Sequence, residues 1–263
     1  MENVSCLTDK LVKDKIIDKW FFVRYSDTGS HVRLRFHGEK EKIVSHAIPL
    51  LHQWINSLMQ TRSISEVSFS TYEREIERYG GEKLMESAES LFYEDSTTTL
   101  SLLKLMVKEI SFSEEIIAAL SLIDFLCGFG LDLQKQIDFF SSLQMPKEQL
   151  TGFRESKSIL LLYGAAILDG DLSSLSEEGL KISQVFEKRR AATTEYAKKI
   201  DEAFERQELL IPQKNIHDSI LHMHCNRFLG RNGNKEIKAR LYAQQTLNVL
   251  KMKKTNVCNY AVV

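Results

Sequence analysis

The chain has 263 residues, of which 43% are hydrophobic and 27% are charged, so it is long enough to bury a core in one or two domains. Its 35 Lys and Arg residues nearly balance 36 Asp and Glu residues, which excludes a global attraction to nucleic acid or to anionic membranes. The 4 cysteines are scattered without a disulfide or zinc-ribbon spacing, and neither a signal peptide nor a membrane-length apolar run occurs. We therefore expect a soluble, cytoplasmic protein.

Two strand-like runs near the N-terminus predict a β-hairpin. Residues 20–25 (WFFVRY) and 31–36 (HVRLRF) are aromatic and β-branched, and they flank the turn-like residues 26–30 (SDTGS). Apolar spacing then predicts a helix over 38–59, and a third strand follows over 65–72. The order strand, strand, helix, strand is typical of a small antiparallel or mixed sheet with a helix on one face.

The second run carries basic side chains on one face. Because side chains alternate along a strand, four cation-capable residues point the same way: His31, Arg33, Arg35 and His37. The apolar residues between them face the core: Val32, Leu34 and Phe36. Two such arginines lie roughly 6 to 7 Å apart, close enough to clamp one carboxylate or to stabilise an anion. The alternative is a solvated strand edge.

From residue 81 onward the chain predicts helices almost throughout, judged from apolar periodicity and from Gly or Pro punctuation. The expected ranges are 82–94, 97–110, 113–129, 131–143, 147–168, 176–208, 215–229 and 234–253. Residues 95–97 (Asp-Ser-Thr) form an expected N-cap, and Gly128 with Gly130 ends the preceding apolar helix. No flexible linker interrupts the chain.

The fold class is therefore α+β. A small, mainly antiparallel sheet with a hairpin lies in the N-terminal third, within residues 18–80, and a predominantly helical remainder occupies 81–263. We expect the whole chain, 1–263, to be a single domain.

A second informative stretch, residues 68–81 (SFSTYEREIERYGG), groups two arginines. If the strand continues, Arg74 and Arg78 share one face; if a helix begins near Glu73, they pair at i, i+4, and Glu75 lies one turn before Arg78. The alternative to a functional site is a surface ladder of ion pairs.

A third stretch, HMHCNR, contains two histidines. On a helix His222 and Asn226 are i, i+4 neighbours and share a face with Cys225, whereas His224 points elsewhere. A structural zinc site needs four ligands, and no other Cys/His pair has a compatible spacing, so we expect no metal. A histidine that carries a proton fits better, because its pKa lies near neutrality and nearby arginines would lower it. A hydrogen-bonded core histidine is the alternative.

The segments WFFVRYSDTGSHVRLRFHG, FSTYEREIERYGG with LFYEDS after it, and HMHCNR resemble the C-terminal domain of lantibiotic dehydratases, which also occurs as stand-alone proteins in thiopeptide pathways. The resemblance spans nearly the whole chain. In that family a partner domain transfers glutamate from glutamyl-tRNA onto Ser or Thr of a precursor peptide. The C-terminal domain then expels the glutamate and leaves dehydroalanine or dehydrobutyrine.

The resemblance implies catalytic roles for four residues. Arg33, Arg35 and Arg78 would bind the glutamyl carboxylates or the developing oxyanion, and His222 would act as general acid or base. Glu75 would orient Arg78 through an ion pair.

The implied substrate-binding set also includes five further residues: Arg74, His31, His224, Asn226 and Arg227. The group that removes the Cα proton stays open, and His224 remains an alternative to His222. No cofactor is expected, because no glycine-rich nucleotide loop occurs and elimination needs none.

The resemblance also implies partners: a glutamylated precursor peptide, a glutamylating domain or subunit, a lanthionine cyclase and a transporter. The last two would place a cytoplasmic protein in a membrane-associated complex, and direct binding of nucleic acid is not expected. The family has a strand and part of a helix before the WFF motif, whereas 19 residues precede Trp20 here. We therefore expect a fragment, a split subunit or an open sheet edge, and with it a homodimer or a complex with the glutamylating partner.

Two other functions fit the same resemblance. A thiopeptide pyridine synthase resembles this domain but joins two dehydroalanines by a formal cycloaddition and releases a leader peptide. The nearly complete set of arginines and the histidine favours elimination, since a cycloaddition has no glutamyl carboxylate to hold. A non-catalytic module that binds the leader or the partner enzyme would need a groove but no working histidine.

Overall fold

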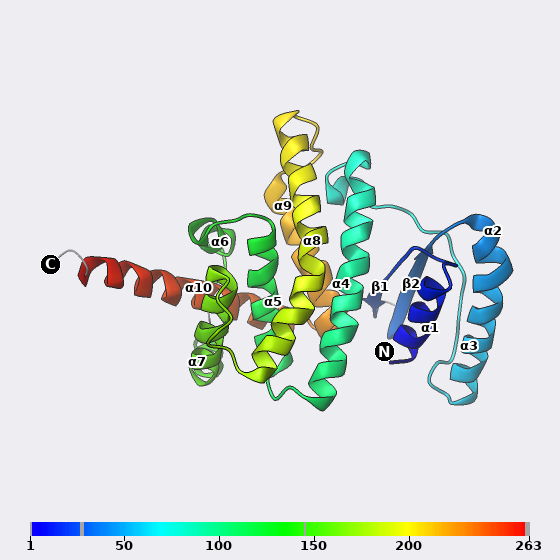
Figure 1. Cartoon of the computed structure of the whole chain (residues 1–263), viewed down its shortest axis with the longest axis horizontal. Helices are drawn as coiled ribbons and strands as arrows, with labels where there is room; N and C mark the ends of the chain where they lie inside the picture. Colours follow the sequence, from blue (N-terminus) through cyan, green and yellow to red (C-terminus); the bar gives the residue numbers. More distant parts are fainter. Residues whose placement is uncertain (1, 27–28, 145, 261–263) are drawn as a thin grey trace.

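The computed structural model describes residues 2–26, 29–144 and 146–260. A hairpin with short helical elements lies at one end of the molecule, and the long helices form the rest (Figure 1). The elements follow in this order: α1 (Glu2–Lys13), β1 (Lys19–Tyr25), β2 (His31–His37), α2 (Lys40–Lys42), a π-helical turn (Ile43–Ala47), α3 (Ile48–Gln60), a 3-10 turn (Glu77–Tyr79), α4 (Glu82–Lys108), α5 (Glu114–Gly128), α6 (Leu133–Phe139), α7 (Lys147–Asp169), α8 (Glu177–Glu205), α9 (Gln213–Leu229) and α10 (Gly233–Tyr260). The predicted α+β class, mostly helical after an N-terminal hairpin, is confirmed.

The hairpin has the predicted pairing. β1 and β2 are antiparallel, with Phe21 opposite Arg35 and Val23 opposite Arg33. These four residues therefore lie on one face of the sheet, because partners across an antiparallel pair point the same way. The predicted turn includes residues 27 and 28, which lie outside the described part of the chain.

The other face of the hairpin packs on a small core with α1 and α3. Trp20 and Phe22 are buried there, and Leu34 and Phe36 pack against them partly buried. Val32, which the alternation also predicts to face the core, is instead 44% exposed. It lies beside the turn of the hairpin, beyond the part of the sheet that this cluster covers.

The larger core belongs to the helical body, and α5 is its central helix (Figure 1). Every residue from Ile116 to Leu126 is buried, as expected for a helix that is apolar on all sides. Phe21 and Val23 of β1 join this core, so the hairpin separates the two cores and contributes one face to each. No described helix is both long and apolar enough to cross a membrane.

One of the two predicted helix boundaries is wrong and the other is confirmed. The expected break at residues 95–97 does not occur, because α4 continues unbroken from Glu82 to Lys108. These cap-like residues lie in mid-helix and are buried or half-buried. By contrast, α5 ends at Gly128 as predicted, and Gly130 follows with a positive φ of 73°.

The predicted third strand is wrong. Among the described residues the sheet has two strands, and residues 65–72 belong to neither a strand nor a helix. Strand-like composition alone does not create a ladder, because β-propensity mostly reports packing against neighbours. Here Tyr72 packs its ring against Phe21, at 5.6 Å between centroids, on the face of the hairpin rather than along its edge.

Candidate active site

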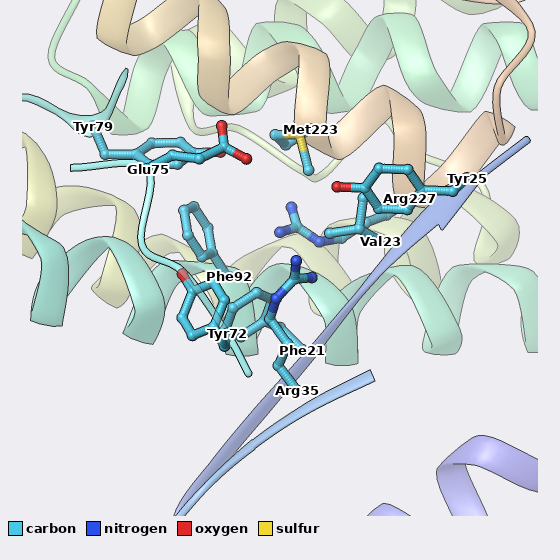
Figure 2. Close-up of a pocket in the computed structure, with 10 residues that line it drawn as sticks. All are labelled: Phe21, Val23, Tyr25, Arg35, Tyr72, Glu75, Tyr79, Phe92, Met223 and Arg227. Atoms are coloured by element: carbon cyan, nitrogen blue, oxygen red, sulfur yellow. The ribbon is translucent and has the colours of Figure 1, made fainter. Parts of the chain in front are cut away.

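A pocket opens where the hairpin meets α4, α9 and the segment of residues 72–79 (Figure 2). The space between its walls is about 300 Å³ when the open solvent at its mouth is included. The side chains that line it are Phe21, Val23, Tyr25, Arg35, Tyr72, Glu75, Tyr79, Phe92, Met223 and Arg227. Aromatic rings form much of the wall, so a charged group that faces the pocket is partly removed from water.

Arg35 faces this pocket from β2 (Figure 2). Its guanidinium carbon lies 4.8 Å from the ring centroid of Tyr72 and 5.4 Å from that of Phe21. Its Nη1 is buried and has no hydrogen-bond partner within the described structure. Burial and then the charge of Glu89 raise the pKa of Tyr72, so the phenol keeps its proton. Arg35 thus presents an unused donor beside a neutral hydroxyl.

Arg227 faces the same pocket from α9, and its position is fixed by two hydrogen bonds. Its Nε donates to the carbonyl oxygen of Phe22 at 3.0 Å, and its Nη1 donates to Oδ2 of Asp95 at 3.0 Å. Its Nη2 is buried and meets no acceptor among the described residues. Figure 2 shows the guanidinium groups of Arg227 and Arg35 pointing into the same space. Two unused donors on positive groups favour a bound anion there.

Asp95 is the centre of a buried ionic network behind Arg227. Its carboxylate also accepts a hydrogen bond from Arg189 at 2.9 Å and lies 2.7 Å from Nδ1 of His224. Arg189 in turn donates a second hydrogen bond to Asp124 at 2.9 Å. Burial alone would raise the pKa of Asp95, but its three partners outweigh burial and hold the pKa well below its usual range. Burial lowers the pKa of His224, so we assign a neutral ring that donates from Nδ1.

Arg33 lies at the rim of the pocket. Its guanidinium carbon is 3.8 Å from the ring centroid of Tyr25, whose side chain lines the pocket. Its Nε lies 3.4 Å from Nε2 of His31, and the ring of His31 stacks on Tyr25 at 5.4 Å. The predicted basic face of β2 therefore reaches the pocket: Arg35 is part of its lining, whereas Arg33 contacts the lining residue Tyr25.

Arg74 and Arg78 take different partners. The predicted ion pair of Glu75 with Arg78 is present at 2.7 Å, and Glu75 lines the pocket. Arg74 instead donates from Nε and Nη2 to the two carboxylate oxygens of Glu89, each at 2.8 Å. Arg78 thus lies next to the pocket, whereas Arg74 is bound by α4.

The two histidines of α9 lie in opposite environments. His222 is 49% exposed, and its Nδ1 is 3.0 Å from Glu236. Burial alone would raise the pKa of Glu236, but the hydrogen bond from His222 and the charge of Arg240 outweigh it, so this pKa is lowered. His224 is sealed in the core network. The described residues contain no cluster of three or more His, Cys, Asp or Glu side chains able to hold a metal.

Asn226 holds β1 in place. Its Oδ1 accepts from the amide of Arg24 at 2.9 Å, and its Nδ2 donates to the carbonyl of Arg24 at 2.9 Å. The amide of Phe22 donates to Ser96 Oγ at 3.3 Å. Side chains of α4 and α9 therefore bond the edge of β1 that faces away from β2.

The structure brings three predicted residues together around one pocket: Arg35, Glu75 and Arg227. It leaves His222 outside the lining, one residue before Met223, which is part of it. The sequence reading missed Asp95 and Tyr72. The burial of Asp95 could have been predicted from the sequence, because it lies three residues after Phe92 and seven before Leu102, on the apolar face of α4. A carboxylate on that face is buried and needs cationic partners.

Comparison with known proteins agrees with the motifs. A family model described as "Lantibiotic biosynthesis dehydratase C-term" matches residues 1–247. Subtilin biosynthesis protein SpaB of Bacillus subtilis is 32% identical over 93% of this chain and 24% of its own length. Nisin biosynthesis protein NisB of Lactococcus lactis subsp. lactis is 28% identical over 87% of this chain and 22% of its own length. The chain thus spans about a quarter of the length of these relatives.

Solved structures share the fold. The tRNA-dependent lantibiotic dehydratase MibB from Microbispora sp. 107891 superposes with a TM-score of 0.82 and 24% identity, over 95% of this chain and 26% of that one. TsrL superposes with a TM-score of 0.59 and 12% identity, over 94% of this chain and 89% of that one.

Proposed function

The chain belongs to the family of C-terminal domains of lantibiotic biosynthesis dehydratases, and from this premise we propose that it eliminates glutamate from glutamylated Ser or Thr of a precursor peptide. The products are dehydroalanine or dehydrobutyrine in the peptide and free glutamate. A glutamylating domain or subunit would supply the ester.

The reaction needs three kinds of group. A base removes the proton on Cα, the electron pair left on Cα forms the Cα=Cβ double bond, and the Cβ–O bond breaks so that glutamate leaves as a carboxylate. The site must therefore accept a proton, stabilise the enolate-like charge and hold an acidic leaving group. No redox partner and no group transfer are involved.

The observation that carries the proposal is the pair of unused guanidinium donors in one pocket. Arg35 Nη1 and Arg227 Nη2 line a largely aromatic space and have no hydrogen-bond partner in the described residues. A glutamyl carboxylate would satisfy both donors, and the low local polarity would strengthen each bond. Arg33 at the rim and Arg78 beside Glu75 would bind the second charge of the leaving group or the developing oxyanion.

We assign the proton transfer to His222 rather than to His224. His224 is fully buried and bonded to Asp95, so a peptide has no access to it. His222 is half exposed and lies on α9, the helix that also carries Met223 and Arg227, and both of these residues line the pocket. Glu236 engages its Nδ1, which leaves Nε2 as the ring nitrogen for proton exchange.

The test is direct. The purified chain is incubated with a precursor-type peptide that carries a chemically installed glutamyl-Ser ester, without tRNA or ATP, and the products are followed by mass spectrometry and by release of free glutamate. The proposal expects dehydroalanine and glutamate in equal amounts. An unchanged peptide, with a chain shown to be folded by circular dichroism, would contradict it.

A further inference from the structure

One edge of the hairpin is closed and the other is open. Side chains bond the backbone of β1 on its outer edge: the amide of Phe22 donates to Ser96, and both backbone groups of Arg24 pair with Asn226. β1 therefore has no room for a further strand. β2 has β1 as its single neighbour in the sheet of the described residues, and each of its residues is half-buried or exposed.

The pairing register shows which groups of β2 point outward. Phe22 is opposite Leu34, and Arg24 is opposite Val32. Because Phe22 and Arg24 direct their backbone groups away from β2, these are the non-hydrogen-bonded pairs of an antiparallel ladder. Leu34 and Val32 must then direct their amide and carbonyl groups away from β1. An open edge of this kind is a template for another strand.

We propose that the outer edge of β2 binds the glutamylated precursor peptide as an extended third strand. This inference rests on the proposed function and names the way in which its substrate docks. Main-chain hydrogen bonds to Val32 and Leu34 would hold the peptide largely independently of its side chains. Peptides with different sequences around the modified residues would thus share one binding mode.

The position of the arginines on the same strand favours this occupant. Neighbouring strands lie about 4.8 Å apart, and directly opposed side chains share one face. A modified residue opposite Arg33 or Arg35 would therefore project its glutamyl group over the basic face of β2, within reach of the pocket. The free carboxylate of the glutamyl group complements that face.

The same charges disfavour a second copy of this chain on the edge. Pairing β2 with β2 would bring Arg33 and Arg35 of the two copies onto neighbouring strands, and like charges opposite each other destabilise a sheet. A peptide that brings a glutamyl carboxylate to this face meets no such repulsion. The observations therefore favour the peptide over a homodimer through this edge.

A proline substitution tests the edge without touching the arginines. Val32→Pro removes one outward amide, and proline is tolerated on an edge strand whose amide faces solvent. Val67→Pro is the matched control, because Val67 is the same residue type and is similarly exposed, at 41%, but lies outside the sheet. Both variants are first checked for folding by circular dichroism and thermal unfolding.

Binding is measured with a peptide in which diaminopropionate replaces the modified Ser, so that an amide holds the glutamyl group and elimination is blocked. We expect Val32→Pro to weaken the affinity roughly threefold to tenfold, the effect of one lost hydrogen bond, and Val67→Pro to leave it unchanged. Equal affinities of Val32→Pro and the unaltered chain would overturn the inference. Concentration-dependent self-association that Val32→Pro abolishes, without an effect on peptide binding, would also overturn it.

Backbone methylation of the peptide gives a second readout. In a strand, alternate amides face the partner, so single N-methyl groups along the peptide should weaken binding with a period of two residues. A uniform or absent effect would contradict a strand. Turnover separates this inference from the proposed function: if a minimal glutamyl-Ser derivative is never converted, the chemistry fails, whereas the alternation reports only the docking mode.

Discussion

At the scale of single residues, Arg35 and Arg227 differ in how they are held. Arg227 is fixed by Phe22 and by Asp95, which is itself bound in a buried ionic network. Arg35 is held by contacts with aromatic rings, among them that of Tyr72, and its Nη1 makes no hydrogen bond to any described group. A rigid cation and a more adaptable one thus share the pocket, which suits a ligand that must enter and leave.

Substitution of Arg35 should separate activity from stability. In Arg35→Gln the charge-assisted bonds proposed for the glutamyl group would be lost, and we expect kcat/KM for elimination to fall by about tenfold to a hundredfold. Because the guanidinium forms few bonds of its own, the free energy of unfolding should change by less than about 1 kcal/mol. Elimination assays and urea unfolding measure the two quantities.

Arg206→Gln is the matched control for that variant. Arg206 is exposed at the C-terminal end of α8, away from the pocket lining, and its loss removes the same charge. Full activity of Arg35→Gln, or an equal loss in both variants, would contradict a specific role for Arg35.

At the scale of elements, neighbouring side chains of α9 make contacts with different parts of the molecule. Met223 and Arg227 line the pocket, His224 joins the core network, and Asn226 bonds β1. Helical spacing predicts which of these share a face. It does not predict which face is buried, because α9 is packed on most sides and its apolar pattern is weak.

Asn226 makes a testable link between α9 and the hairpin. In Asn226→Asp the carboxylate still accepts from the amide of Arg24 but has no hydrogen to donate to its carbonyl. We expect the free energy of unfolding to fall by about 1 to 3 kcal/mol. Urea denaturation measures the change, with Asn56→Asp on the exposed face of α3 as control. A stability equal to that of the unaltered chain would show that the link contributes nothing.

The hairpin and the helices show what the sequence reveals at this scale. The period-two pattern correctly placed Arg33 and Arg35 on one face, because a strand's geometry alone fixes alternation. Residues 65–72 have the same kind of pattern but form no strand, because strand-like composition mostly reports packing against neighbouring side chains and does not by itself cause pairing. Residues 95–97 resemble a helix cap because Asp and Ser bind backbone groups, but here Asp95 and Ser96 make long-range contacts instead.

At the scale of the whole molecule, the candidate site lies between two hydrophobic cores. The smaller one joins α1 and α3 to one face of the hairpin, and the larger one fills the helical body and meets the other face. The sequence predicted the family and an N-terminal hairpin followed by a mostly helical remainder, but neither α1 nor the absence of a third strand among the described residues. It could not predict this division, because it depends on contacts between residues up to 205 positions apart, such as Phe22 with Arg227.

Acid should destabilise the molecule through His217. Its ring is buried against Phe129 at 4.2 Å between centroids, and burial lowers its pKa from 6.5 to about 4. Below pH 6.5 the unfolded state therefore binds a proton that the folded state resists, so stability falls as the pH drops from about 6.5 to about 4. The full effect is about 3 kcal/mol.

Thermal unfolding over this pH range tests the assignment. His217→Phe keeps a ring against Phe129 but takes up no proton, so its stability should depend less on pH than that of the unaltered chain. His52→Phe, on the exposed side of α3, should retain the original dependence. The same pH profile in all three proteins would show that His217 is not the source.

In the proposed reaction, the pocket recognises the acidic side chain of a glutamyl ester and the glutamate is expelled from the peptide. The most direct measurement compares the initial rates at which the purified chain forms dehydroalanine from a glutamyl-Ser peptide and from the same peptide carrying a glutaminyl-Ser ester. The leaving group is the same type of carboxylate in both, and only the side-chain charge differs. We predict conversion of the glutamyl peptide about tenfold to a hundredfold faster; equal rates, or no conversion of either peptide, would contradict the account.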